Sequence, residues 1–319
     1  MIKVVNPSVE LWAQEGYTLD AIWKHIAKCA RVCYQSTPKN NGETDYGFIV
    51  RTLLKGKDVV NKNYYNIKTC HLSVFEHGTV HLKYRLFMIE DTVRANRFIN
   101  NRYSKTKEDD GYLYVTTNMR VLIENNWMNE LEFIDTTPNC PYYYERVTVN
   151  FITDIGASRE LNRHRVNSIS EESTRYCRYN ADKFGNNITV AKLPWIPDVN
   201  HDNVSSDYSD GFYNDDEIYY DGIIRDKYAV NWTAIDWFLY GLQIANLVYC
   251  KCIELGWTAQ QAREILPLNT KTQVVHTAFV DDWQHFIDLR SSGVSGVPHP
   301  MAKELADKVD DLINATICG

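Results

Sequence analysis

Apolar and polar residues follow one another along this chain with two different periods. Behind Thr18, apolar side chains recur every three or four positions up to Cys33, which predicts an amphipathic helix with Thr18 as its N-cap. At 79–84 and again at 146–152 the period is two, which predicts strands with one buried face. The same patterns predict further strands at 112–115 and 272–280, and helices at 46–55, 87–100, 119–131, 157–165, around 171–179, at 218–255 with a break near Gly222, after Thr258, at 282–290 and after Pro300.

Two stretches interrupt this pattern. Residues from 86 to 144 form an elaboration, with a charged turn at 105–111 and a Pro-rich break at 137–141. Residues 198–217 are acidic and turn-rich, and a solvated loop is favoured there because the ligand spacing of a calcium loop cannot be placed. Helices and strands mix without strict β-α-β alternation, so we expect a mixed α/β or α+β fold with an insertion near 86–144.

The composition is that of a globular protein. Of 319 residues, 44% are hydrophobic and 24% charged, which excludes collagen-like, coiled-coil and largely disordered chains. With 34 Lys and Arg against 41 Asp and Glu, the formal charge is −7, which argues against nucleic-acid binding. The longest apolar stretch, 237–250, is interrupted by Gln243 and Asn246 and is shorter than the ~20 residues that span a membrane.

The cellular compartment is predicted from the cysteines and the first residues. No apolar secretion signal is visible at the start. The eight cysteines are scattered and form no CxxC pair, which indicates reduced thiols rather than a disulfide framework. We therefore expect a cytoplasmic protein that does not contact a membrane.

The densest candidate for chemistry is the stretch 159–178, which carries five Arg and three Glu. On a helix, Glu160, Arg163 and His164 would project from one face. Hydroxyl groups follow, and hydroxyls and backbone N–H groups near a helix start, flanked by guanidinium groups, suit a phosphate. A solvated surface helix with Glu–Arg pairs is the alternative. The hydroxyl residues are Ser168, Ser170, Ser173 and Thr174.

A longer motif favours the functional alternative. Arg163-His164-Arg165, followed after seven residues by Ser173-Thr174-Arg175-Tyr176, resembles the signature of the flavin-dependent thymidylate synthases. Other segments resemble this family in the same order, and they are 29–33, 71–77, 262–269 and 285–290. The resemblance implies one domain over 1–319, with a central sheet flanked by helices, and a homotetramer whose active sites are shared between subunits.

The resemblance also implies the reaction. The family methylates dUMP to dTMP with methylenetetrahydrofolate as carbon donor and with FAD, reduced by NADPH, as hydride carrier. By position, dUMP would be bound by Glu160, Arg163, Glu171, Glu172, Ser173, Arg175, Arg263 and Arg290, and FAD by Ser73, Glu76, Arg163, His164, Arg165, Glu171 and His285. Arg290 would lie at the uracil edge as the catalytic residue.

The chemistry of the residues agrees with these roles. A phosphate dianion suits the guanidinium groups of Arg175 and Arg263. A guanidinium at N3 of uracil stabilises the deprotonated ring, so that no enzyme nucleophile is needed. Ser173 lacks the surroundings of an activated serine and is expected to bind phosphate. Neither Cys177 nor Cys140 is followed by a nearby His, so neither is expected to act as a nucleophile.

Alternatives and departures remain. A metal site at His77 and His81 has no third ligand, so structural histidines are favoured. No Gly-x-Gly-x-x-Gly segment follows a strand, so FAD would not be held by a Rossmann fingerprint. The same mechanism on another pyrimidine nucleotide, or a flavin- or nucleotide-binding protein without turnover, are the competing hypotheses. Four residues depart from the family pattern, namely Cys33, Glu160, Ser170 and Asp281.

Overall fold

The computed structural model of the chain describes residues 2–38, 42–60, 70–196 and 233–318. They fall into two compact units, which we call the small unit (1–6 and 178–271) and the main unit (7–177 and 272–319). The prediction of one domain over 1–319 stays a prediction. The predicted acidic loop at 198–217 and the helix break near Gly222 lie outside the described residues.

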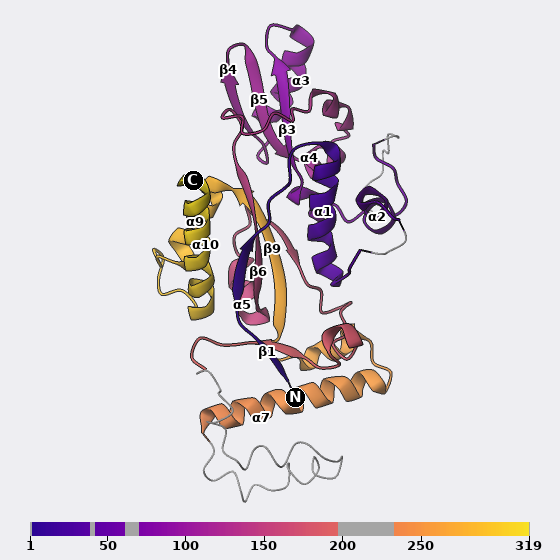
Figure 1. Ribbon diagram of the computed structural model, residues 1–319, viewed down its shortest axis with the longest axis vertical. Coiled ribbons are helices and arrows are strands. Elements are labelled where there is room, and N and C mark those ends of the chain that lie inside the picture. The colour runs from indigo at the N-terminus through magenta and orange to yellow at the C-terminus, as the bar shows by residue number, and fades with distance from the viewer. Residues whose placement is uncertain (1, 39–41, 61–69, 197–232, 319) are drawn as a thin grey trace, which may run out of the picture. The chain divides into compact units, whose positions relative to one another are not determined.

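A four-stranded sheet forms the centre of the main unit (Figure 1). β2 pairs with β6, and β7 with β9, both antiparallel. The sequence predicts one buried face for β6, but its polar face is buried too, because Thr148 and Asn150 take part in hydrogen bonds inside the unit. The strands, in spatial order, are β2 (Ser8–Leu11), β6 (Arg146–Asp154), β9 (Lys271–Phe279) and β7 (Ser168–Glu171).

Helices pack against this sheet, so the mixed α/β fold class is confirmed. α1 begins behind Thr18, whose hydroxyl accepts a hydrogen bond of 3.3 Å from the Ala21 N–H, and it packs against β7. α10 packs against α9, α5, β2 and β6. The helices are α1 (Leu19–Tyr34), α2 (Asp45–Thr52), α5 (Ile155–Leu161), α9 (Val280–Arg290) and α10 (Pro300–Cys318).

The elaboration adds two antiparallel strands to β3, and two of its predicted elements are wrong. The predicted charged turn at 105–111 is strand β4, and only Asp110 and Gly111, with φ of 43° and 75°, form the turn of a hairpin. The predicted helix at 119–131 stops early and gives way to a 3₁₀ turn. The elements are β3 (Thr79–Arg85), α3 (Ile89–Ile99), β4 (Lys105–Asp109), β5 (Tyr112–Asn118), α4 (Met119–Glu124) and η2 (Met128–Phe133).

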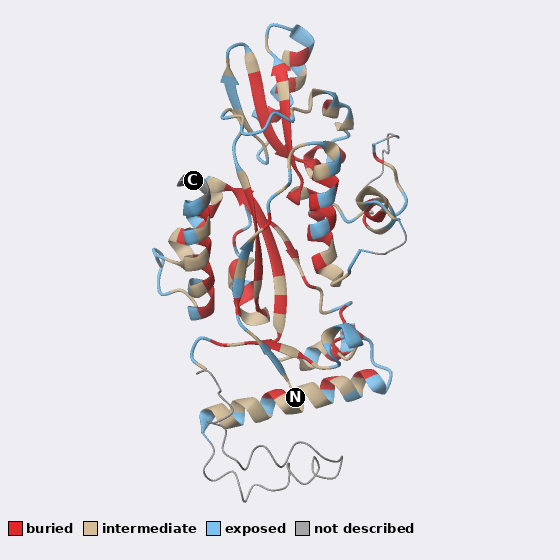
Figure 2. Ribbon diagram, viewed as in Figure 1, coloured by how far each residue is buried: buried red, intermediate tan, exposed pale blue. Residues whose placement is uncertain are grey.

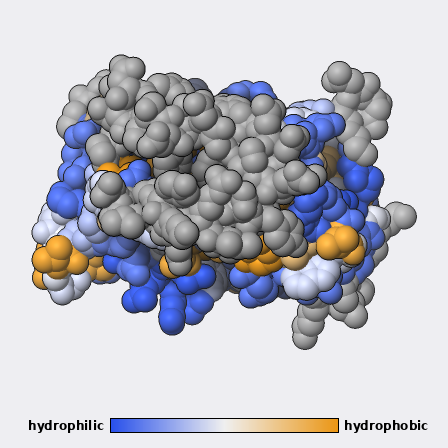
Figure 3. All heavy atoms as spheres, turned by 90° about the horizontal axis from the view of Figure 1, so that it is seen from below, coloured by the Kyte–Doolittle hydropathy of each residue, from blue (hydrophilic) through white to orange (hydrophobic). Residues whose placement is uncertain are grey.

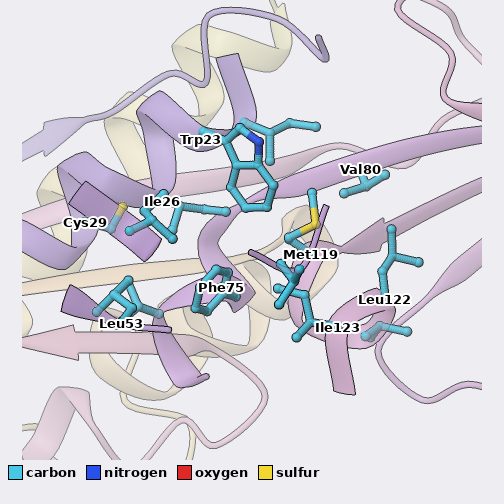
Figure 4. Close-up of a cluster of buried hydrophobic side chains, with 14 of the residues drawn as sticks. Trp23, Ile26, Cys29, Leu53, Phe75, Val80, Met119, Leu122 and Ile123 are labelled. Carbon is cyan, nitrogen blue, oxygen red and sulfur yellow. The ribbon is translucent and has the colours of Figure 1, made fainter. Parts of the chain in front are cut away.

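One hydrophobic core joins the elaboration to the N-terminal helices (Figure 4). Trp23 and Ile26 of α1 lie in it with Phe75 of η1 (Ser73–His77), and all three are buried. Met119 and Leu122 from α4 complete this part of the core. Figure 2 shows much of α1 in red, as buried.

The described residues of the small unit form a parallel pair of short strands, two α-helices and two 3₁₀ turns. The described part of the helix predicted at 218–255 is α7, which Thr233 and Asp236 open with a capping box. Thr258 caps the next helix, as predicted. The elements are β1 (Lys3–Val5), η3 (Asp182–Phe184), β8 (Thr189–Ala191), α7 (Ala234–Glu254), α8 (Ala259–Ala262) and η7 (Arg263–Ile265).

The surface carries both hydrophobic and hydrophilic residues. On the face that Figure 3 shows, hydrophobic residues form separate patches between hydrophilic ones. Among the helices of the described ranges, none combines the length and the apolar character needed to cross a bilayer. Seven cysteines with described side chains are not joined in disulfides, and they are Cys29, Cys33, Cys70, Cys140, Cys177, Cys250 and Cys252.

Candidate functional site

The motif segment folds differently from its prediction. α5 ends at Leu161, so Arg163 and His164 lie beyond the helix instead of on one of its faces. Ser168 and Ser170 lie in strand β7, not near a helix start, and the chain turns after Glu171 where a helix was predicted around 171–179. Residues 168–171 form a strand because pairing with β9 satisfies their backbone hydrogen-bonding groups.

Arg290 nevertheless reaches this segment. It is the last residue of α9, and its side chain is 15% exposed. Its Nε donates a hydrogen bond of 3.1 Å to Nε2 of His164, and its Nη1 donates one of 3.0 Å to a carboxylate oxygen of Glu160. The other carboxylate oxygen of Glu160 lies 3.7 Å from Nε of Arg163. The structure thus brings together the predicted catalytic residue and three predicted ligand-binding residues.

His164 is held neutral in this cluster. Burial lowers its pKa to about 4, and the positive charge of Arg290 and the neighbouring His285 act in the same direction. Because Nε2 accepts the hydrogen bond from Arg290, the ring proton of the neutral form lies on Nδ1. The ring of Phe286 packs against it at 4.8 Å. A neutral imidazole orients the guanidinium without competing with it for an anion.

The acidic and hydroxyl residues that follow are anchored to β9 and α1. The two carboxylate oxygens of Glu171 accept hydrogen bonds from Asn162 (2.8 Å) and Thr272 (3.2 Å). Glu172 is buried, and its N–H donates to the carbonyl of Gln273. The N–H of Ser173 donates to the carbonyl of Cys33 at the end of α1. These three predicted residues therefore share one edge of the sheet.

The predicted cationic residues have two locations. Arg163, Arg165 and Arg175 are exposed on the main unit. Arg263 lies in the small unit, where its Nε donates to Glu264 at 3.2 Å. Exposed guanidinium groups suit an anionic ligand such as the pyrophosphate of FAD or a nucleotide phosphate, because they donate charge-assisted hydrogen bonds. The exposed arginine side chains of the main unit therefore have the hydrogen-bond donors that such a ligand needs.

The remaining residues predicted to bind FAD lie on η1 and on α9. Ser73 is exposed at the start of η1, and His285 is exposed on α9 with its ring 6.1 Å from that of His164. Glu76 forms an ion pair with Arg120, a residue of the elaboration. The elaboration therefore contacts the predicted flavin-binding segment directly.

His77 and His81 have different surroundings. Nδ1 of His77 hydrogen-bonds Thr277 at 2.8 Å, and its Nε2 hydrogen-bonds Ser170 at 2.9 Å. The ring of His81 is stacked between those of Tyr17 and Tyr143. In the parts of the chain that are described, no group of three or more His, Cys, Asp or Glu side chains could hold a metal ion. Both nitrogens of His77 are thus engaged by hydroxyls within the fold.

A cavity of about 180 Å³ lies between α1 and α2. It is lined by Arg31, Tyr34, Ser36, Thr37, Phe48, Arg51 and Thr52. None of the predicted site residues belongs to this lining, so the cavity is separate from the cluster at Arg290.

Sequence reasoning missed several residues that contact the site. Asn162 and Thr272 hold Glu171, and Arg120 holds Glu76. His276 is buried in β9 and contacts Asn162. The sequence did carry one signal for His276. It is a polar residue within the largely apolar strand segment 274–279. The partners could not be found because they lie up to 114 positions apart in the chain.

Comparison with solved structures finds distant similarities. A UMP/dUMP methylase, PolB from Streptomyces cacaoi, bound with 5-Br UMP, is 16% identical, with 98% of this chain and 90% of that chain covered at a TM-score of 0.41. The same protein bound with 5-Br dUMP gives a TM-score of 0.37 at 16% identity, with 98% and 91% covered.

Sequence comparison is more specific. A flavin-dependent thymidylate synthase from Thermosipho africanus (strain TCF52B) is 26% identical over 151 residues, which cover 47% of this chain and 57% of that relative. The family model described as "Thymidylate synthase complementing protein" matches residues 140–312, more than half of the chain. This range includes the Arg163-His164-Arg165 motif and Arg290, and the resemblance to the flavin-dependent thymidylate synthases is confirmed. The chain therefore belongs to the family of thymidylate synthase complementing proteins.

Proposed function

We propose that this protein is a flavin-dependent thymidylate synthase. It methylates dUMP to dTMP, with methylenetetrahydrofolate as carbon donor and NADPH as reductant, and it acts as a cytoplasmic homotetramer. Family membership supports the proposal, and the cluster of Arg290, His164 and Glu160 carries it, because it joins the family motif to the predicted catalytic arginine.

Arg290 is prepared for a pyrimidine. A guanidinium has five N–H donors, and His164 and Glu160 engage two nitrogens of this one. Within the described residues, the third nitrogen, Nη2, has no hydrogen-bond partner, so it can donate to a uracil carbonyl. The positive charge beside N3 stabilises the deprotonated ring and makes carbon 5 electron-rich enough to accept the one-carbon unit. The two contacts fix the guanidinium plane before substrate binds, which lowers the entropic cost of orientation.

The other predicted site residues bind the nucleotide and the flavin. Arg175 and the Ser173 hydroxyl bind the phosphate of dUMP. Arg263 of the small unit stays a residue that the family resemblance predicts to bind dUMP. Glu160, Glu171 and Glu172 surround the nucleotide, and Arg163 contacts both ligands. Ser73, Glu76, His164, Arg165 and His285 hold the flavin, which supplies hydride chemistry when bound. No side chain forms a covalent bond to uracil in this proposal, so Ser173 acts only as a hydrogen-bond donor.

A direct assay tests the proposal. Purified protein is mixed with FAD, NADPH, dUMP and methylenetetrahydrofolate carrying a labelled methylene group, and labelled dTMP is measured, with UMP in a parallel reaction. We expect dTMP from dUMP. Absence of a labelled product with both nucleotides, while FAD is bound and NADPH is oxidised, would overturn the proposal in favour of a protein without methyl transfer.

The Arg290→Ala variant tests the role of the arginine. Loss of a charge that stabilises the reacting ring should lower kcat by about 100-fold or more. Flavin absorbance of the purified variant should remain near that of the wild type, because His164 and the other flavin-binding residues stay. Arg51→Ala is the matched control, since Arg51 is exposed on α2 and pairs only with Glu43 among the described residues. Turnover of Arg290→Ala at the wild-type rate would exclude this role.

A further inference from the structure

Glu171 is held by a partly buried network of hydrogen bonds that none of the predicted ligand contacts requires. Its Oε2 accepts a hydrogen bond of 2.8 Å from Nδ2 of Asn162, the residue that caps the C-terminus of α5. The Oδ1 of the same Asn162 lies 3.2 Å from Nε2 of His276 in β9. Nδ1 of His276 lies 3.2 Å from Nδ2 of Asn167. These hydrogen bonds thus connect the buried His276 in the sheet with the carboxylate of Glu171.

The donor and acceptor roles in this hydrogen-bond network follow from the carboxylate of Glu171. An ionised carboxylate only accepts, so Asn162 must present its amide N–H₂ to Glu171 and its carbonyl oxygen to His276. Nε2 of His276 must then carry the ring proton, and Nδ1 is left to accept from Asn167. In this arrangement each of the three contacts pairs one donor with one acceptor. Any other orientation of the amide of Asn162 or placement of the proton on His276 would leave at least one contact without such a pair.

Burial keeps the imidazole in the required form. His276 is fully buried, and its ring packs against Phe151 at 5.4 Å and Trp283 at 6.2 Å. Burial lowers its pKa to about 3, and the nearby His164 acts in the same direction. A neutral ring with its proton on Nε2 is a fixed donor, whereas a cationic ring would turn a second N–H toward the amide of Asn167.

We propose that Asn162 and His276 are positioning residues for Glu171, which they orient for the pyrimidine nucleotide. The inference rests on the proposed function, in which Glu171 contacts dUMP. Thr272 holds the other carboxylate oxygen, so both oxygens are fixed by residues outside the motif's predicted ligands. A rigid sheet strand and the end of a helix together set the carboxylate before substrate arrives.

A double-mutant cycle tests whether Asn162 acts through Glu171. Asn162→Leu removes both of its amide contacts at similar volume, and we expect kcat/KM for dUMP to fall by about tenfold or more, mainly through KM. In the Glu171→Ala background the same substitution should change kcat/KM by less than about twofold, because there is no carboxylate left to orient. A purely structural role would give the same loss in both backgrounds.

Asn150→Leu is the matched control. Asn150 is a buried amide in strand β6 of the sheet, and its Oδ1 accepts from Gln273 at 2.8 Å. Its effect should be equal with and without Glu171. Binding of dUMP by calorimetry replaces turnover as the readout if Glu171→Ala is too slow to assay.

Conservative rescue tests His276. The side-chain amide of His276→Gln can donate to Asn162, so this variant should keep kcat/KM within about threefold of wild type, whereas His276→Leu should match Asn162→Leu. Equal losses in the Gln and Leu variants would overturn the role of His276.

The inference and the proposed function fail separately. If wild-type protein makes dTMP and the Asn162–Glu171 cycle is additive, only the inference is wrong. If wild-type protein makes no dTMP, the proposed function is wrong, and the same cycle on the free energy of unfolding still reports whether the two residues interact. Coupling in both cycles supports the inference.

Discussion

Arg290 is held by two residues that lie 126 and 130 positions before it in the chain. Glu160 pairs with it, and His164 accepts a hydrogen bond from it in a neutral form. A carboxylate in contact with a guanidinium lowers the cost of keeping the charge partly buried. At the scale of single residues, the site therefore depends on pairs that join the motif to α9.

Arg175 should have a different effect from Arg290. It is exposed, and we expect it to bind the dUMP phosphate before and during the reaction. Arg175→Ala should raise KM for dUMP by about tenfold or more and change kcat by much less, because uniform binding is lost. Steady-state kinetics over a range of dUMP concentrations measure both constants. A fall in kcat with unchanged KM would show that Arg175 acts on the chemical step.

At the scale of elements, the elaboration is an organised part of the main unit. Its strands extend β3, and α4 places Arg120 against Glu76. Lys105 of β4 pairs with Asp281 at the start of α9. The acidic side chain of Asp281, which departs from the family pattern, is thus neutralised by the ammonium group of Lys105 from the elaboration. Two ion pairs connect this insertion to segments predicted to bind the flavin.

The hairpin of the elaboration offers a test of stability. Gly111 has a φ of 75°, a conformation that a branched side chain adopts only with strain. Gly111→Val should lower the free energy of unfolding by about 1–2 kcal/mol, measured by urea denaturation. Asp110→Gly at the neighbouring position, where φ is 43°, should cost less than about 0.5 kcal/mol, because glycine adopts this conformation freely. Equal losses in both variants would argue against the hairpin.

At the scale of the whole molecule, buried histidines link stability to pH. Burial lowers the pKa of His276 to about 3 and that of His25 to about 4. Below about pH 6.5 the unfolded chain takes up protons that the folded chain does not, so stability is full above that pH and falls as the pH drops toward 4.

The free energy of unfolding should be lower at pH 5 than at pH 7.5 by about 2 kcal/mol per histidine. Urea denaturation at the two pH values measures this difference. The exposed His71 supplies the control, since His71→Ala should leave this difference unchanged. A free energy of unfolding that is the same at both pH values would contradict neutral burial of these side chains.

Local signals in the sequence determined much of this protein. The helix behind Thr18, the strands at 79–84 and 146–152, and the motif that indicates the family all depend on residues close together in the chain. Caps, turns and periodicity act over a few residues, which is why they could be predicted. The Asp110-Gly111 hairpin carried such a signal too, although the charged residues before it suggested a turn.

Tertiary structure alone decided the rest. Residues 168–171 form a strand because β9, about a hundred residues later, offers backbone partners. The contacts of Arg290 with His164, and of His276 with Asn162, likewise join segments that are distant in sequence. A periodic pattern shows which face of an element is apolar, but not which other element will cover it. Hydrogen-bond partners are set only when the packed chain brings donor and acceptor within about 3 Å of each other.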